Sequence, residues 1–449
     1  MFHLKSFGLV QSLLQGCLRM VHGKLTCTVV SYFLITCFAM TSAMATPPSE
    51  EEIAPTPEID TYKSTVIDDL KEDKEIEDTG ASQNLTPKWY DRIGIRGYVQ
   101  TRYNRLFETN PQLKCAQCDR SWGENGGFFL RRIRLIFFGQ VHQQVYFYIQ
   151  PDIASGGANF GQIRDAYFDV ALDKKLEFRV RIGQSKVPFG FENLQSSQNR
   201  IPLDRQDGLN SAVANERDLG VFFYWAPAKI RERFRYLVAS GLKGSGDYGV
   251  AGIGLYNGQT ANNPEANNEP HAVGRLSYPF KFNNGQYVEA SIQGYSGEFI
   301  IDRSQPVSED QLAFREHRAA ASLIVYPQPL GFQAEYNIGN GPEFNPTTMD
   351  VENRDLRGGY AMAMYYIETE NNIFIPFFRW HHYKGGKKHE LDATRHRVNE
   401  QEIGVEWQPN RNFELVAMYT FSDRTFESYD NPENRQTGSL LRLQAQVNF

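Results

Sequence analysis

The sequence predicts an all-β fold, a transmembrane antiparallel β-barrel of about 16 strands, preceded by a short N-terminal periplasmic segment that is disordered or partly helical. Three observations predict this fold. Segments that strictly alternate apolar and polar residues recur from about residue 91 to the C-terminus. After residue 45 no run of 18 apolar residues occurs, which excludes spanning helices. The mean hydropathy is −0.49 although 13% of the residues are aromatic, a combination typical of barrels with aromatic girdles.

Residues 1–45 are predicted to be a secretory signal peptide that is cleaved on export. The segment 25–49 contains no charged residue and includes the apolar run TVVSYFLITCFAM. Ala43 and Ala45 form an A-x-A cleavage site. An uncleaved anchor is the alternative, but the apolar run is shorter than the ~20 residues that a spanning helix needs. Met20 is an alternative start of the chain.

The next segment, 46–90, is predicted to be an acidic periplasmic linker. Residues 50–78 contain 12 acidic and 3 basic residues, a formal charge of −9. The exported chain, 46–449, also carries −9, because residues 1–45 hold three basic and no acidic residues and the whole chain carries −6. The predicted barrel domain, 91–449, is therefore close to neutral, which argues against a nucleic-acid-binding protein.

Within the barrel domain, the alternation assigns one face of each strand to lipid and the other to a water-filled lumen. In the run FLRRIRLIFFGQV, Ile133, Leu135 and Phe137 share one face, whereas Arg132 and Arg134 share the other. The last strand, 441–449, ends on an aromatic residue and is predicted to close the barrel. The run FLRRIRLIFFGQV spans 129–141, and the other clear runs are 93–107, 144–152, 164–172, 176–184, 330–339 and 412–423.

The connections between these strands alternate between short turns and long loops, as in outer-membrane barrels with periplasmic turns and extracellular loops. This alternation places both ends of the mature chain in the periplasm. The count of 16 treats 233–257 as one long strand interrupted near GLKGSG. The long loops are 108–126, 153–160, 187–216, 257–269, 299–312, 341–353, 385–396 and 425–437, and the short turns are 142–144, 173–175, 327–329, 370–372 and 409–412.

Basic residues on the predicted lumenal faces suggest an anion path, because one guanidinium group can donate two hydrogen bonds to the oxygens of a phosphate. Arg132 and Arg134 are the strongest candidates, since both lie on one face of one strand. An alternative is a network of mutually paired charges. The candidate cations are Arg96, Arg102, Arg132, Arg134, Arg179, Arg181, Arg235, Arg275, Arg379 and Arg442, and the carboxylates on the same faces are Asp165, Asp169, Glu177, Glu335, Glu402, Glu406 and Glu414.

The 30-residue loop 187–216 is a candidate constriction. A barrel of this size leaves a wide aqueous channel by default, and a loop folded inward would narrow it. An ordinary surface loop is the alternative. The charged candidates in and beside this loop are Lys186, Arg200, Asp204, Arg205 and Asp207.

No catalytic, metal or cofactor motif is recognisable, so we expect neither an enzyme nor a bound cofactor. Cys115 and Cys118 form a C-x-x-C pair, which an oxidising compartment could close into a small disulfide. Free thiols remain an alternative, and no second C-x-x-C follows that would complete a zinc site. His381 and His382 are adjacent in a predicted strand and would point to opposite faces.

Several stretches resemble the phosphate-selective porin O/P family over about residues 90–449. They include FFLRRIRLIFFGQVHQQVYFYIQPD, GQSKVPFG and IPFFRWHHYKGG. The resemblance implies a 16-stranded, homotrimeric outer-membrane porin of a Gram-negative bacterium. It also implies passive diffusion of small anions, with phosphate favoured by lumenal Arg and Lys. Of these cations, Arg132, Arg134 and Lys186 lie in matching motifs.

Two other functions remain open at this point. One is a general diffusion porin without preference for phosphate. The other is a structural or adhesive outer-membrane barrel, which the acidic linker favours. An enzyme built on a barrel would need a clustered active site, and the scattered carboxylates do not form one.

Overall fold

The structure, a computed structural model, describes residues 89–115, 125–153, 161–214, 217–306, 308 and 312–449. The predicted signal peptide and nearly all of the predicted linker lie outside the described residues. The chain divides into two units, Met1–Ile76 and Glu77–Phe449. The described residues all belong to the second unit.

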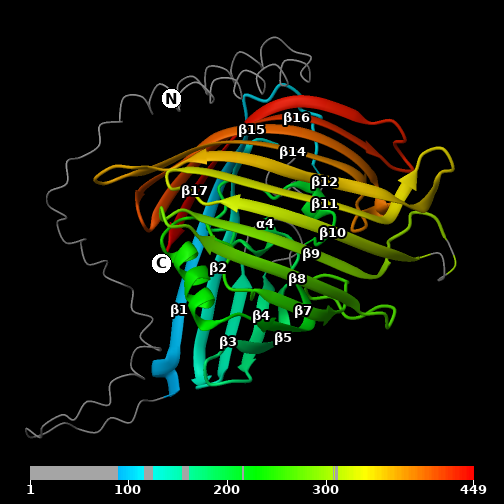
Figure 1. Cartoon of the computed structure of the whole chain (residues 1–449). Coiled ribbons are helices and arrows are strands. Elements are labelled where there is room, and N and C mark those ends of the chain that lie inside the picture. The colour runs from blue at the N-terminus through cyan, green and yellow to red at the C-terminus, as the bar shows by residue number, and fades with distance from the viewer. Residues whose placement is uncertain (1–88, 116–124, 154–160, 215–216, 307, 309–311) are drawn as a thin grey trace, which may run out of the picture. The chain divides into compact units, whose positions relative to one another are not determined.

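The second unit is a closed antiparallel barrel, and 16 strands cross its wall in the described residues (Figure 1). β1 pairs with β2 on one side and with β17 on the other, so the sheet has no free edge. β13 continues β12 and pairs with the same strand, β14. The predicted fold class and strand number are therefore confirmed. The strands are β1 (Ile93–Leu106), β2 (Gly127–His142), β3 (Val145–Asp152), β4 (Gln162–Ala171), β5 (Phe178–Lys186), β6 (Arg217–Trp225), β7 (Ala251–Tyr256), β8 (His271–Lys281), β9 (Tyr287–Ile300), β10 (Ala313–Val325), β11 (Leu330–Asn345), β12 (Asp350–Tyr365), β13 (Ile367–Glu368), β14 (Ile373–Gly386), β15 (Arg395–Asn410), β16 (Phe413–Glu427) and β17 (Arg435–Asn448).

The helices are short and lie in the connections. They are η2 (Trp89–Arg92), α4 (Phe191–Leu194), α5 (Asp207–Asn210), α6 (Ala228–Ala239) and η4 (Leu391–Ala393). None of the helices in the described ranges is long and apolar enough to cross a membrane.

The predicted strand over 233–257 is wrong in its first half. Residues 228–239 form α6, and only Ala251–Tyr256 pair as a strand, β7. The physical reason is the spacing of Ile230, Phe234 and Leu237, which places all three on one helical face, where they are buried. The strand count stays at 16 because β7 alone supplies this crossing.

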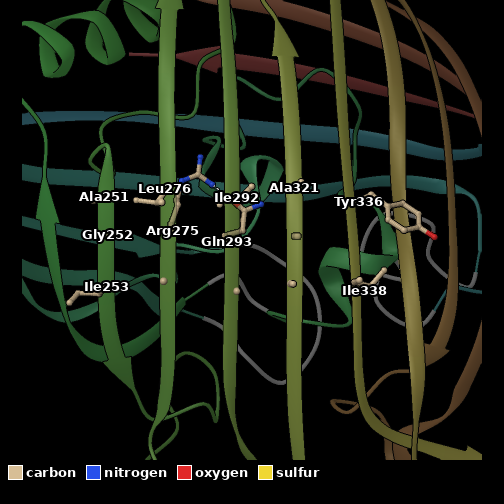
Figure 2. Close-up of a pocket in the computed structure, with 14 residues that line it drawn as sticks. Ala251, Gly252, Ile253, Arg275, Leu276, Ile292, Gln293, Ala321, Tyr336 and Ile338 are labelled. Carbon is tan, nitrogen blue, oxygen red and sulfur yellow. Dashed lines mark hydrogen bonds between the residues drawn. The ribbon is translucent and has the colours of Figure 1, made fainter.

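The outer face of the barrel is apolar at mid-height, as the alternation predicts. Figure 2 shows a groove of about 660 Å³ that crosses β7 to β11 on this face. Its side chains include Ile253, Leu276 and Ile292, which are 61%, 54% and 60% exposed. Ala319 and Ala321 are too small to fill the space between them. The groove is bordered by apolar side chains of the outer face.

Candidate functional site

The connection between β5 and β6, described from 187 to 214 and here called the inward loop, folds into the barrel. Nearly all of its residues are buried. Figure 1 shows its helix α4 inside the ring of strands. Gly190, which precedes α4, has φ 83°, a conformation that favours glycine. A side chain there would also meet Leu209 at 2.4 Å.

Apolar packing fixes the inward loop against two parts of the lumenal wall. Phe189 and Leu209 pack in a cluster with residues of β6 to β10, such as Phe222 and Tyr295. On the other side, Ile201 and Leu203 pack in a cluster with residues of β12, β14 and β16. These two clusters cover the lumenal face of β6–β10 and β12–β16, and they leave the face of β1–β5 to polar and aromatic side chains.

Buried ion pairs fix the same loop to strands that are distant in sequence. Each carboxylate of the loop pairs with a guanidinium or ammonium group of the barrel. A further arginine of the barrel donates hydrogen bonds to the backbone of the loop. Because an unpaired buried charge is costly, these contacts specify the position of the loop. The pairs are Glu192 with Arg379 at 2.6 Å, Asp204 with Arg102 at 3.2 Å and with Arg442, and Asp207 with Arg424 at 2.7 Å and with Lys387 at 2.5 Å. Arg318 of β10 donates to the carbonyl of Gly208 at 3.1 Å and to the Ser211 hydroxyl at 2.7 Å.

The two aspartates of the loop are held in their charged form. Burial alone would raise the pKa of Asp204, but Arg442, Arg102 and Arg131 lower it below its usual range. The same competition acts on Asp207, where Arg424 and Lys387 overcome burial and lower the pKa well below its usual range. Both carboxylates therefore remain ionised at neutral pH.

Asp207, His381 and Glu400 place potential metal ligands within 4.8 Å of one another. Their oxygens are already engaged by cations of the protein. Arg424 donates to Asp207 and, at 2.6 Å, to Glu400, and His381 contacts Glu400 at 2.7 Å. This group is an ion-pair network that anchors the loop, and the cations in it disfavour a divalent metal.

A cluster of guanidinium groups lies where the inward loop passes β1, β2 and β4. We call Arg102, Arg131, Arg132, Arg134, Arg164 and Arg200 the arginine cluster. Among the described residues, two carboxylates lie within it. Asp152 pairs with Arg134 at 2.8 Å and interacts with Arg132 and Arg164. Asp204 pairs with Arg102. The cluster thus gathers six guanidinium groups around two carboxylates of the described residues.

Arg131 and Arg132 are the least neutralised members of the arginine cluster. Arg132 donates to the Gln100 side chain at 2.7 Å and lies near Arg134, Arg102 and Arg200. The Nε atoms of Arg131 and Arg132 are buried and have no hydrogen-bond partner among the described residues. Buried donors of this kind are normally satisfied, so these two donors stand out among the arginines of the lumenal wall.

Two β-bulges each bring an additional arginine into the lumen. Simple alternation of inward and outward side chains does not predict these two positions. The β1–β2 register shifts between Gln100 and Thr101, which leaves Arg131 as the extra residue. The β3–β4 register shifts between Gln150 and Pro151, which leaves Arg164 as the extra residue. A bulge interrupts alternation and re-aims a side chain. The alternation of the sequence did not predict either arginine to be lumenal, and the adjacent basic residues in RRIR are the only signal for Arg131.

The other predicted lumenal cations occupy different surroundings. Arg181 makes two hydrogen bonds to Asp169, at 2.7 and 2.9 Å, and Arg179 contacts Asp247 at 2.8 Å. Arg379 is fully buried between Glu192 and Glu402. Arg275 pairs with Glu289 at 3.3 Å, and Arg442 with Asp204. The paired-network alternative therefore describes these five arginines.

The remaining candidates fall into three groups. Lys186 donates to the carbonyls of Leu194 and Gln195 at 3.0 and 2.8 Å, so it braces the inward loop. Arg200 and Arg205 lie in that loop, where Arg205 donates to Asn193 at 3.3 Å. Arg96 is exposed on the lumenal face near one end of β1.

Two predicted positions need a correction or lie outside the described residues. Arg235 was predicted to line the lumen, but it lies on the exposed face of α6, because the segment is helical. Cys115 is disulfide-bonded. Cys118 lies outside the described residues.

The family model for phosphate-selective porin O and P matches residues 113–449. The chain belongs to this family. The porin therefore forms a channel across the bacterial outer membrane, as its closed barrel also indicates. No curated protein matches the porin.

Three solved structures of other porins are similar to this barrel, and one of them has a TM-score above 0.5. OmpF of Salmonella typhi, in complex with daunomycin, has 13% identity and a TM-score of 0.51, and covers 80% of this porin and 97% of its own chain. The channel DcaP of Acinetobacter baumannii has 13% identity and a TM-score of 0.49, with coverage of 80% and 97%. An anion-selective porin of Comamonas acidovorans has 9% identity and a TM-score of 0.48, with coverage of 80% and 99%. At these identities the likeness concerns the fold alone.

Proposed function

We propose that the porin passes small anions by passive diffusion and favours phosphate among them. The observation that carries this proposal is the arginine cluster, which gathers six guanidinium groups on the lumenal side of β1, β2 and β4 and in the inward loop. Rings of like charge set the selectivity of channels. Phosphate oxygens accept paired hydrogen bonds from guanidinium groups, and the Nε donors of Arg131 and Arg132 have no partner among the described residues.

We further propose that the inward loop constricts the passage beside this cluster. Support comes from the ion pairs that hold the loop to β1, β14, β16 and β17. A narrow passage makes local charge more important than net charge, because electrolyte screens over ~8–10 Å at physiological salt. The near-neutral net charge of the barrel domain is therefore compatible with anion preference.

The test is the reversal potential of the purified porin in a planar bilayer across a KCl gradient. We expect a potential that reports chloride passing more readily than potassium. Phosphate added to one side is expected to reduce the chloride current, because it competes for the same guanidinium groups. A cation-selective channel would refute the proposal. An anion-selective channel that phosphate does not block would favour a general diffusion porin. The ion pairs that balance Arg179, Arg181 and Arg379 support that alternative.

We propose that the mature porin, residues 46–449, assembles as a homotrimer in the outer membrane after cleavage behind Ala45. The support is the family and the A-x-A pattern at residues 43–45. Native mass spectrometry from mild detergent is expected to give three times the intact mass of a chain that begins at Thr46. A monomer would contradict the assembly, and a chain retaining the segment 25–45 would contradict the cleavage.

A further inference from the structure

A row of aromatic side chains lines the lumen on β2, β3 and β4. Phe138 pairs in register with Tyr148, and Tyr148 with Tyr167. The rings of Tyr148 and Tyr167 stack with centroids 5.3 Å apart and an interplanar angle of 14°. All three side chains retain partial exposure. Their sequence neighbours point to lipid, so the exposed parts of the rings face the lumen.

The inward loop leaves this aromatic row uncovered. Its apolar residues pack on β6–β10 and on β12–β16, and none of the aromatic row belongs to those clusters. Rings that served only as packing would be covered by apolar neighbours. Because Tyr148 and Tyr167 stack face to face, the row offers its partly exposed ring edges to a solute in the remaining passage.

Guanidinium groups lie at both ends of the aromatic row. Arg181 lies 3.8 Å above the ring of Tyr167, but its charge is taken up by two hydrogen bonds to Asp169. Arg96 lies 5.2 Å from the ring of Phe138. It is exposed, and no carboxylate pairs with it among the described residues. Only Arg96 is thus available to bind an anion beside the rings.

We propose that Arg96, Phe138, Tyr148 and Tyr167 form a binding subsite for aromatic carboxylates. The carboxylate would accept hydrogen bonds from the Arg96 guanidinium, while the face of the solute ring packs against the exposed edges of the row in an edge-to-face contact. Inorganic phosphate would use only Arg96 there, so this subsite selects a solute class that the arginine cluster does not. The inference extends the proposed function, because it concerns the same passage and the same sign of charge.

The probe is benzoate, compared with acetate and with cyclohexanecarboxylate, which has a ring of similar size but is not planar. Current noise of the intact porin in planar bilayers gives the binding constant of each. We expect benzoate to bind about tenfold more tightly than acetate, the order expected for one or two aromatic edge-to-face contacts, and more tightly than cyclohexanecarboxylate. Equal binding of the three anions would overturn the subsite without any variant.

Variants assign the effect to residues. Tyr148→Leu with Tyr167→Leu is expected to weaken benzoate binding about tenfold, with acetate binding unchanged. Arg96→Gln is expected to weaken benzoate and acetate alike. The matched control is Tyr336→Leu, because Tyr336 lies on the lipid-facing side. Unchanged benzoate binding in the double variant would overturn the proposal. Benzoate binding in a channel that prefers cations would sink the proposed function and leave the subsite standing.

Discussion

Replacing both Arg131 and Arg132 with alanine is expected to lower the anion/cation permeability ratio about tenfold. These two residues carry the least neutralised charge of the arginine cluster. A charge 4 Å from a passing ion contributes about 1 kcal/mol in bulk water and more beside a protein wall. Two such charges exceed the roughly 1.4 kcal/mol that corresponds to a factor of ten. The reversal potential across a KCl gradient measures the ratio, and block by added phosphate is expected to weaken in parallel.

The matched control for this pair is Arg354→Ala with Arg435→Ala. Both arginines pair with carboxylates at exposed positions, where their side chains are 50% and 67% exposed. This variant removes the same formal charge at strongly exposed positions, where solvent screens it. A wild-type permeability ratio in the lumenal variant, or an equal loss in the control, would show that the arginine cluster does not set selectivity.

The alternation predicted the barrel because each strand has one face toward lipid and one toward the lumen. Its side chains must therefore alternate between apolar and polar. For β2 the alternation assigned Arg132 and Arg134 to the lumen and Ile133 to lipid, and the structure has both arginines buried inside and Ile133 only partly buried. The closing strand follows the same pattern and pairs with β1, for example Val447 with Val99. Local pattern was sufficient here because one constraint, the membrane, acts on the whole wall.

Alternation failed wherever the backbone departs from a regular strand. Arg131 and Arg164 enter the lumen at bulges, and a bulge depends on the register of the partner strand rather than on the residue itself. In α6, the sequence IRERFRYL satisfies both a period of two and a helical spacing. The helix forms because it buries Ile230, Phe234 and Leu237 on one face. Such tertiary contacts are not encoded in the order of neighbouring residues.

The anchoring of the inward loop could not be predicted from sequence either. The sequence identified Asp204 and Asp207 as charged residues of a long loop, but their partners Arg442 and Arg424 lie more than 200 residues away. Which wall the loop reaches depends on the apolar clusters around Leu209 and Leu203. Pairing across the lumen is thus a consequence of the closed barrel, which brings distant strands face to face.

Asp207→Ala is expected to release one end of the inward loop and to raise both the single-channel conductance and the open-channel noise. The substitution leaves Arg424 and Lys387 close together with one carboxylate fewer between them. Breaking a buried pair in this way costs about 3–5 kcal/mol in a dry interior, and water in the lumen makes that an upper bound. A lower melting temperature is expected in the same protein. Single-channel recording and thermal unfolding in detergent measure the two effects.

Two further variants separate loss of the tether from loss of charge balance. Asp207→Ala combined with Lys387→Ala removes the surplus cation, so it is expected to regain part of the stability while conductance stays high. Asp423→Ala is the matched control, because Asp423 pairs with Arg435 at 2.8 Å at an exposed site, where a pair contributes about 0–1 kcal/mol. Wild-type conductance and noise in Asp207→Ala would mean that the apolar clusters alone hold the loop, and the ion pairs would then serve chiefly to neutralise the arginines of β16 and β17.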